Sequence, residues 1–289
     1  TLLIYVPKIL LFLVLFIEDV TRLVEACIMS FVDEEREQFF SPRRRFVSQI
    51  ALGIAAIPFG SLLYGMTIGK YNFKVIKQQI FFDDLPEEFD GTTITQISDI
   101  HSGSFDNQTD RIKYAVDLIN EQDADIVLFT GDLVNYEASE IKPYISILKN
   151  IKTKTKVYSI LGNHDYGTYK QWNSTQEMSS NFNQLIDIQR NELGWDLLMD
   201  EHRILEKNGT TLAIIGVQYI GHSMRFGKYG HLRNAYNGAE NAAVQLLLSH
   251  DPSHWDYEVS QQSIFKNIHA TFAGHTHGFQ FGIEIRGIK

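Results

Sequence analysis

The 289-residue sequence has little of what marks a disulfide-stabilised, thiolate-ligated or nucleic-acid-binding protein. It contains one cysteine, Cys27, so the rest of the chain has neither a disulfide nor a thiolate metal ligand. The net charge is −9 and no long basic stretch offsets it, which argues against a nucleic-acid-binding surface. There is no internal repeat and no low-complexity segment. The chemistry of this acidic protein must therefore come from other residue types.

Charged residues are also missing from one long stretch, Phe46–Gly69, which is long enough to cross a bilayer. Thr1–Ile17 is likewise apolar apart from Lys8. We therefore predict two membrane helices within residues 1–69, joined by an amphipathic, mostly acidic connector at Glu18–Phe40.

A linker is predicted at residues 70–90, where the sequence shifts from basic to acidic and contains Pro86, as expected of a hinge. A globular domain is predicted over residues 91–289. The chain begins inside an apolar run without Met, and it stops twelve residues after His277, within a run at Phe279–Ile285 that resembles another strand. We expect both ends to be shortened and the domain to be C-terminally incomplete.

Short apolar runs alternate with helical patterns along this domain. Buried strands are predicted at Ile94–Ile97, Ile126–Phe129, Val157–Leu161, Leu212–Val217, Leu246–Leu248 and Ala270–Ala273, and helices at Asp110–Asn120, Ile141–Asn150 and Phe182–Leu193. The alternation predicts a layered α/β domain with largely parallel strands. Asn208-Gly209, between Arg203–Glu206 and Thr211–Ile215, is typical of a two-residue hairpin, so part of the sheet should be antiparallel.

Five short polar patterns follow the strand-like runs. They read Asp99-Ile100-His101, Gly131-Asp132, Gly162-Asn163-His164-Asp165, His250 and Gly274-His275-Thr276-His277. Side chains beyond the carboxyl ends of parallel strands converge, and the three glycines let the backbone turn sharply there. Two carboxylates, one amide oxygen and several imidazoles form the ligand set of a two-metal hydrolase.

In residue type and in order, these patterns resemble the calcineurin-like metallophosphoesterases, whose pattern is D-x-H, G-D, G-N-H-[DE], H and G-H-x-H. The match runs from about Ile94 to Gly278 without substitution in the core letters. The resemblance implies an α/β four-layer sandwich, in which two mixed β-sheets are flanked by helices. Here that domain would be preceded by N-terminal membrane helices, as in membrane-anchored bacterial phosphohydrolases of this family.

The resemblance also implies which residues hold the metals. One ion would be held by Asp99, His101, Asp132 and His277, and the other by Asp132, Asn163, His250 and His275. The implied activity is metal-dependent hydrolysis of a phosphoester or pyrophosphate, by in-line attack of a hydroxide that bridges the two ions. Nitrogen and oxygen ligands suit two divalent or mixed-valence ions of manganese, iron or zinc.

His164 is not a ligand in this family. The resemblance implies that it acts on the leaving-group oxygen, either as a proton donor or as a stabiliser of negative charge. Asp165 follows directly and is predicted to hold the imidazole in its orientation.

Four further residues are weaker candidates for substrate contact. Asn135 and Tyr166 lie near the motifs in sequence, although polar residues there often only support loops. His222 and Arg225 belong to a loop that either is solvated or selects substrate by pairing with an anionic group. By contrast, we predict structural roles for His202, His254 and His269, and a turn role for Asp251.

Three functions from different classes remain open. The favoured one is a membrane-anchored phosphoesterase acting on a phosphorylated small molecule or lipid, with UDP-2,3-diacylglucosamine as a narrower, lipid-linked alternative. A catalytically inactive metal-binding scaffold is a second, but it would have no chemical need for His164 and Asp165. A nuclease is the third, and acidic charge and membrane tethering argue against it.

Positive charge indicates an orientation. Arg43-Arg44-Arg45 precedes the second apolar stretch, and clustered arginines stay on the cytoplasmic side. We therefore predict a bacterial inner (cytoplasmic) membrane protein with its catalytic domain on the outer or periplasmic side. Ser41–Val47 also resembles a twin-arginine export signal, while Lys70, Lys74 and Lys77 on the far side oppose the charge argument.

Overall fold

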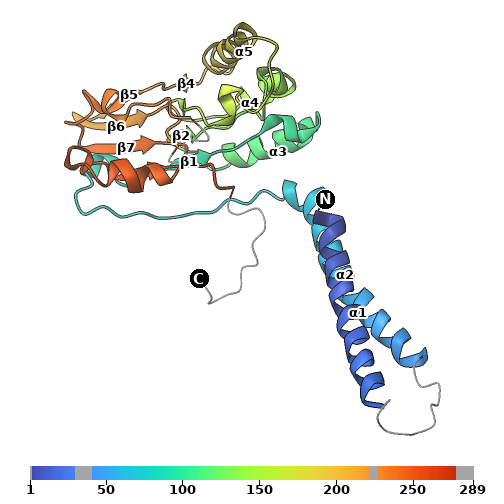
Figure 1. The fold of residues 1–289 in the computed structure, drawn as a ribbon. Coiled ribbons are helices and arrows are strands. Elements are labelled where there is room, and N and C mark those ends of the chain that lie inside the picture. Colours follow the sequence, from blue (N-terminus) through green and yellow to red (C-terminus); the bar gives the residue numbers. More distant parts are fainter. Residues whose placement is uncertain (1, 30–40, 222–226, 278–289) are drawn as a thin grey trace. The chain divides into compact units, whose positions relative to one another are not determined.

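The computed structural model describes residues 2–29, 41–221 and 227–277, and the chain divides into two compact units (Figure 1). The first unit is Thr1–Ile76 and the second is Lys77–Lys289. The division falls inside the predicted linker. The strand predicted at Phe279–Ile285 and the candidates His222 and Arg225 lie outside the described residues.

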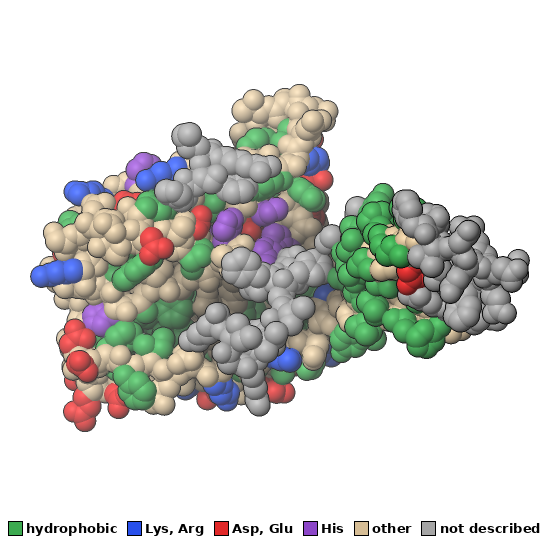
Figure 2. All heavy atoms as spheres, turned by 60° about the horizontal axis from the view of Figure 1, so that its bottom comes forward, with side chains coloured by type: hydrophobic (Ala, Val, Ile, Leu, Met, Phe, Trp, Pro, Cys, Tyr) green, Lys and Arg blue, Asp and Glu red, His purple; other side chains and the backbone are tan. Residues whose placement is uncertain are grey.

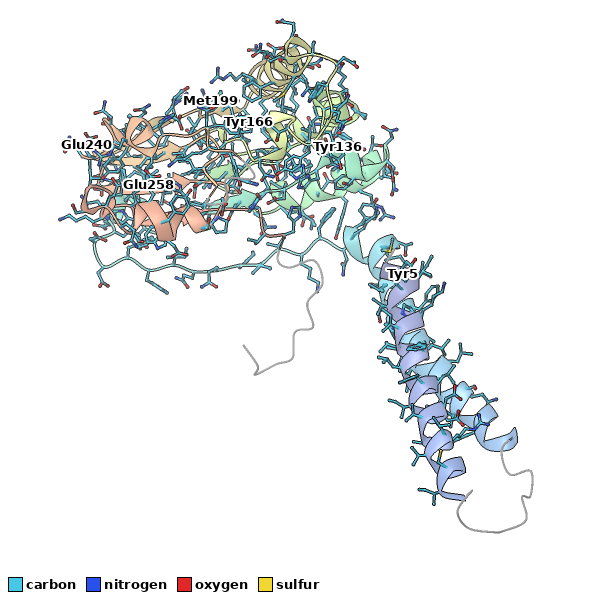
Figure 3. All side chains as sticks on the ribbon, viewed as in Figure 1. Tyr5, Tyr136, Tyr166, Met199, Glu240 and Glu258 are labelled. Carbon is cyan, nitrogen blue, oxygen red and sulfur yellow. The ribbon has the colours of Figure 1, made fainter. Side chains whose placement is uncertain are left out.

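The first unit is a pair of helices, α1 (Leu2–Met29) and α2 (Ser41–Thr67), that pack against each other. A short 3₁₀ turn follows at Gly69–Tyr71. Helix α1 continues into the segment that was predicted as a connector. Large apolar side chains project outward along both helices, among them Tyr5, which is 58% exposed (Figure 3). So much exposed apolar surface is typical of a membrane environment rather than of water.

Composition separates the two helices. In the part of the chain that the structure describes, one helix, Phe46–Tyr71, is long and apolar enough to cross a membrane. Helix α1 carries Lys8 and, further along, Glu18, which is buried with its Oε1 3.7 Å from Nε of Arg22. The charge-free stretch is thus the clearer membrane span.

The described residues of the second unit form two four-stranded sheets. The first sheet has the order β1 (Ile94–Ile97), β2 (Ile126–Phe129), β3 (Val157–Ser159) and β4 (Asp196–Leu197), with every neighbouring pair parallel. The second has the order β5 (Glu201–Lys207), β6 (Thr210–Gly216), β7 (Val244–Leu248) and β8 (Ala270–Phe272). Only β5 and β6 pair antiparallel among these described strands, while β6, β7 and β8 run parallel.

The turn between β5 and β6 confirms the predicted hairpin. Asn208 and Gly209 have φ values of 51° and 82°, the positive values that a two-residue turn matching the twist of antiparallel strands requires. Mixed pairing therefore occurs in the second sheet, whereas the described strands of the first sheet are all parallel.

Alternating side chains of β2 show how the layers form. Ile126 and Leu128 pack in the cluster between the two sheets, while Val127 and Phe129 pack against the helices outside the first sheet. All four side chains are buried, because a strand covered on both faces has no polar side.

Helices cover both outer faces. The first sheet is covered by α3 (Thr109–Asn120), α4 (Ile145–Leu148) and α5 (Thr175–Asp187). The second is covered by α6 (Leu232–Tyr236) and by turns at Trp255–Val259 and Ser263–Phe265. The unit is therefore a sandwich of helix, sheet, sheet and helix layers, as predicted.

Some boundaries differ from the prediction for local reasons. The helix predicted at Ile141–Asn150 is a 3₁₀ turn at Ala138–Tyr144 followed by α4, since Pro143 has no N–H to continue an α-helix. Helix α5 begins earlier than predicted because Oγ of Ser174 accepts the backbone N–H of Glu177 at 3.1 Å.

Candidate metal centre

The predicted ligands all follow strands at the same edge of the sandwich. Loops after β1, β2 and β3 carry Asp99, His101, Asp132 and Asn163, while loops after β7 and β8 carry His250, His275 and His277. Because the parallel strands end at this edge, both sheets deliver side chains to it. Figure 2 shows histidine side chains gathered beside acidic ones on one face of the molecule.

The backbone at these positions is unusual. Five of the seven predicted ligands have left-handed φ values, and these residues are Asp99 (53°), His101 (47°), Asp132 (60°), His275 (71°) and His277 (51°). A non-glycine residue rarely adopts this conformation, and such outliers cluster at functional sites. Gly131 (φ 100°) lies so close to the next loop that a Cβ would meet the backbone nitrogen of Gly162 at 2.5 Å. The loops are therefore shaped to turn these side chains toward one another.

One group of ligand atoms comes from Asp99, His101, Asp132 and His277, which all lie within 4.8 Å of one another. Nε2 of His277 lies 3.4 Å from Oδ1 of Asp99 and 3.2 Å from Nε2 of His101. Two carboxylates this close repel each other unless positive charge lies between them. The donor set therefore fits a divalent cation.

The other group comes from Asp132, His250 and His275, again within 4.8 Å. Nδ1 of His275 lies 2.9 Å from Oδ1 of Asn163, so the amide oxygen of Asn163 faces this second group of ligand atoms. These four residues are the second predicted ligand set.

Asp132 belongs to both groups through one atom. Its Oδ2 lies 3.5 Å from Nε2 of His101 and 3.2 Å from Nε2 of His250, while its Oδ1 accepts the backbone N–H of His164 at 2.8 Å. The side chain is 1% exposed. A buried carboxylate in this position can contact two cations at once.

Hydrogen bonds and burial prepare the imidazoles as ligands. Nδ1 of His250 donates to the backbone carbonyl of Thr130 at 2.6 Å, which leaves Nε2 to face Asp132. Burial lowers the pKa of His101 and of His275, which favours the neutral imidazole that a metal requires. At His250 burial acts in the same direction, but the charge of Asp132 outweighs it and raises the pKa to about 9. A cation binding there would displace a proton.

His164 lies beside the two groups but belongs to neither. Its Nδ1 donates to the backbone carbonyl of Asn135 at 2.8 Å, so Nε2 is the atom left for a substrate. The ring meets His101 edge-on, with the centroids 4.8 Å apart. His164 therefore lies where the sequence predicted it, beside the candidate metal ligands.

The predicted role of Asp165 is wrong. Its carboxylate does not orient His164 but accepts the backbone N–H groups of Asp132 (2.9 Å), Leu133 (2.8 Å), Val134 (3.3 Å) and Gly162 (2.9 Å). Residues 164–166 form a 3₁₀ turn, on which consecutive side chains diverge by about 120°. The fully buried Asp165 therefore points inward and joins the loops that follow β2 and β3.

The weaker candidates have different places. Asn135 orients His164 through its backbone carbonyl, and its side chain donates to Oγ of Ser104 at 3.0 Å. Tyr166 is 5% exposed and stacks on Tyr229 at 3.9 Å between ring centroids, so it is part of the core rather than of an open substrate surface.

The residues predicted to be structural make structural contacts. His202 donates to the carbonyl of Ala235 at 2.9 Å, and His254 lies between Ser249 (2.8 Å) and Glu258 (3.1 Å). Oδ1 of Asp251 accepts both N–H and Oγ–H of Ser253, which confirms the predicted turn. His269 pairs with the backbone N–H of Gln245 at 3.2 Å.

Sequence reasoning missed Tyr169. Its ring stacks on His164 with the centroids 4.2 Å apart and the planes 15° from parallel. Its hydroxyl accepts Nδ2 of Asn163 at 2.7 Å. No motif marks this tyrosine, because its place depends on the path of the loop before α5.

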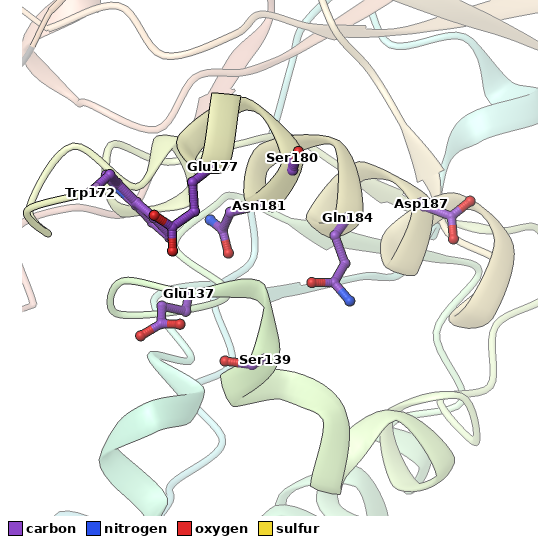
Figure 4. Close-up of a pocket in the computed structure, with 8 residues that line it drawn as sticks. All are labelled: Glu137, Ser139, Trp172, Glu177, Ser180, Asn181, Gln184 and Asp187. Carbon is purple, nitrogen blue, oxygen red and sulfur yellow. The ribbon is translucent and has the colours of Figure 1, made fainter. Parts of the chain in front are cut away.

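A separate hollow of about 590 Å³ lies between α5 and the turn at Ala138–Tyr144 (Figure 4). It is lined by Glu137, Ser139, Trp172, Glu177, Ser180, Asn181, Gln184 and Asp187. None of the predicted ligands is among these residues. The carboxylate of Glu137 pairs with Nζ of Lys170 at 2.7 Å, so part of the acidic lining of this hollow is neutralised.

Comparisons with known proteins agree with this geometry. The family profile "Calcineurin-like phosphoesterase" matches residues 92–279, and "Probable Calcineurin-like phosphoesterase, transmembrane domain" matches residues 1–70. A "Transmembrane protein with metallophosphoesterase domain" from Danio rerio is 26% identical over 94% of this chain and 58% of its own length. The "Uncharacterized metallophosphoesterase YkoQ" from Bacillus subtilis is 25% identical over 80% of this chain and 77% of its own.

Among solved structures, the NAD nucleotidase of Haemophilus influenzae aligns with 64% of this chain and 38% of its own, at 15% identity and a TM-score of 0.42. The alignment with this chain covers a little over half of the length of the Danio rerio relative. It covers about a third of the length of a Helicobacter pylori metallophosphoesterase that is 29% identical over 133 residues. The profile match covers most of the chain and includes every predicted ligand. The chain belongs to the calcineurin-like phosphoesterase family and carries a membrane anchor at its N-terminal side.

Proposed function

We propose that this protein is a membrane-anchored phosphoesterase that works with two metal ions. The observation that supports the number two is the position of Oδ2 of Asp132, which faces His101 of one ligand group and His250 of the other. Shared carboxylates of this kind hold two cations about 3.5–4 Å apart.

In this proposal Asp99, His101, Asp132 and His277 hold one ion, and Asp132, Asn163, His250 and His275 hold the other. When bound, the two ions would supply an activated water and positive charge for the phosphoryl oxygens. Asn163 adds an oxygen without charge, so the site keeps a net positive charge that favours a phosphate anion. Ligands of these types suit manganese, iron or zinc.

His164 would serve the leaving group. Since its Nδ1 hydrogen is donated to the Asn135 carbonyl, Nε2 can carry a second proton toward a leaving oxygen or stabilise the charge that develops there. Asp165 would contribute indirectly, by fixing the loops that carry Asp132 and Asn163.

The direct test combines metal analysis with a substrate panel. The full chain in detergent should bind two equivalents of metal. It should also hydrolyse at least one substrate of a panel that contains p-nitrophenyl phosphate, bis-p-nitrophenyl phosphate and a nucleoside diphosphate ester. Chelation should abolish hydrolysis and metal should restore it. Two bound ions with no hydrolysis of any panel member would favour the scaffold, and hydrolysis that survives chelation would exclude the metal mechanism.

A lipid-linked substrate, such as a UDP-linked diacylglucosamine, is the narrower proposal. Its support is the segment from the end of the membrane span onward. There Ile76 is 88% and Phe81 79% exposed, and Lys70, Lys74 and Lys77 supply positive charge. Apolar and cationic side chains together suit the surface of an anionic bilayer. Hydrolysis of a vesicle-bound substrate should then exceed that of its short-chain, soluble analogue, and equal rates would contradict this narrower proposal.

The location is also a proposal. Arg43–Arg45 before the membrane span supports a bacterial inner membrane protein with its catalytic domain on the outer side. Protease added to intact spheroplasts should cleave the domain, and full protection would place the domain in the cytoplasm.

A further inference from the structure

Tyr169 connects a proposed metal ligand to the proposed leaving-group residue. Its hydroxyl accepts the Nδ2 hydrogen of Asn163 at 2.7 Å, and its ring lies flat on His164 with the centroids 4.2 Å apart. The residue is 38% exposed, so it stands at the open side of the site. None of the sequence motifs includes it.

The hydroxyl of Tyr169 bonds the NH₂ end of the Asn163 amide. A carboxamide has one oxygen that can bind a cation and one NH₂ group that cannot. With the NH₂ group bonded to Tyr169, Oδ1 points to Nδ1 of His275 at 2.9 Å, inside the second ligand group. Without the hydroxyl, Nδ2 loses this partner, and of these two contacts only that of Oδ1 with His275 still orients the amide.

The ring restricts His164 from a different direction. The Asn135 carbonyl fixes Nδ1, and His101 meets the ring edge-on. Tyr169 covers one face of the imidazole, with only 15° between the planes. These contacts together hold Nε2 in one direction, which is what a group serving a leaving atom requires.

The loop that carries Tyr169 is itself secured. Gly167 takes φ 70°, and its carbonyl accepts Nε1 of Trp172 at 2.7 Å. Lys170 pairs with Glu137 at 2.7 Å and lies over the Trp172 ring at 4.4 Å. The tyrosine is thus presented by a short loop with contacts on both sides.

We propose that Tyr169 is a positioning residue with two separable effects. Its hydroxyl sets the Asn163 amide and so the affinity of the second metal site, whereas its ring sets the direction of His164. This inference rests on the proposed two-metal function.

Two substitutions separate the effects in the full chain. Tyr169→Phe removes the hydroxyl and keeps the ring, and it should weaken Mn²⁺ binding at one of two sites by about 10–100-fold, the usual cost of losing a partner that orients a ligand. Tyr169→Leu should weaken that site equally. It should also slow hydrolysis of an alkyl phosphoester more than that of a nitrophenyl ester, because only the alkyl leaving group needs a well-placed proton donor.

Tyr136→Phe is the matched control, since Tyr136 is 45% exposed and its ring is 6.5 Å from His164. It should leave both Mn²⁺ affinities unchanged. Mn²⁺ titration without substrate reads the hydroxyl effect independently of turnover. Wild-type protein that binds fewer than two ions would refute the proposed function. If wild type binds two, equal affinities in Tyr169→Phe, or equal losses at both sites, would refute the hydroxyl role. An unchanged ratio of the two ester rates in Tyr169→Leu would refute the ring role.

Discussion

The two sheets of the globular unit contribute different chemistry to one site. The first sheet supplies every oxygen donor of the proposed ligand set, namely Asp99, Asp132 and Asn163, together with His101. The second supplies imidazoles alone, His250, His275 and His277. Both sheets use the loops after parallel strands, so topology does not explain the difference. In the proposed ligand set, the first sheet would therefore supply the negative charge that attracts cations, and the second would complete their coordination with neutral donors.

Hydrogen bonds cross between the sheets at the site. Nδ1 of His250 donates to Thr130, and the backbone N–H of His275 donates to both carboxylate oxygens of Asp99 at 3.1 Å. Nε2 of Gln96 donates to the Ala273 carbonyl at 2.7 Å. These bonds between protein groups hold the loops of the two sheets in register, which lowers the cost of assembling a site from both.

Asp132→Asn should have the largest effect, because it removes a charge that both ligand groups share. Metal analysis should show both sites weakened by more than about 10–100-fold, and hydrolysis should fall accordingly. The fold should survive, since the amide oxygen can still accept the His164 N–H. Asp106→Asn, an exposed change in the loop after β1, is the control and should bind two ions. Loss of a single ion in Asp132→Asn would show that Asp132 is not shared.

His250→Asn should have a smaller effect, since a ligand from the second sheet belongs to one group. One ion should be lost and the other retained. His254→Asn is a matched control, because His254 is equally buried but bonds Ser249 and Glu258, so it should cost stability while keeping both ions. Loss of both ions from His250→Asn would contradict the division of labour between the sheets.

His164→Asn should keep both ions and slow turnover by about 10²–10⁴-fold, the usual contribution of a positioned acid or base. The loss should be smaller for a nitrophenyl ester than for an alkyl ester, whose leaving oxygen needs a proton. Metal content and the two rates decide the outcome. If an ion is lost, His164 is a ligand, and if both esters slow equally, it stabilises the phosphoryl oxygens instead.

Much of this arrangement could be predicted from local sequence. The bounds of β1 and β2 match the predicted runs, because each is an apolar stretch ended by a polar motif. The motifs converge because parallel strands end at one edge. The two-residue strand β4 and the five-residue α6 were missed, since elements so short have no periodicity to detect.

Contacts that depend on loop shape could not be predicted in the same way. Asp165 is next to His164 in sequence but points the other way, because the 3₁₀ turn separates their side chains. Tyr169 reaches Asn163 and His164 only because of the path of its loop. The left-handed φ values of five ligand positions likewise have no signature in the motif letters.

The smallest expected effect comes from a substitution at the amino-terminal ends of the first sheet's strands, opposite the edge that carries the predicted ligands. Asp125 precedes β2, and its carboxylate accepts N–H and Oγ–H of Thr93 at 2.8 and 2.7 Å and pairs with Nζ of Lys154 at 3.0 Å. Burial alone would raise the pKa of Asp125, but these partners outweigh it and lower the pKa to about 2. The corresponding entry to the second sheet uses a neutral acceptor instead, since Nδ1 of His269 accepts the backbone N–H of Gln245 at 3.2 Å.

The sign follows from the lowered pKa. Asp125 contributes stability while it is ionised in the folded protein, so its contribution is full above about pH 4 and is lost as the pH falls toward 2. Asp125→Asn should lower the Tm by no more than about 2–4 °C at pH 6, because the side chain is about one-third exposed and solvent screens its charge. That difference from wild type should shrink toward zero near pH 2. Asp123→Asn, a change beside the same lysine, is the matched control and should lower the Tm at pH 6 less than Asp125→Asn does, because the Asp123 side chain is 88% exposed. A Tm difference for Asp125→Asn that stays constant from pH 6 to pH 2 would mean that the carboxylate charge does not stabilise this end of the sheet.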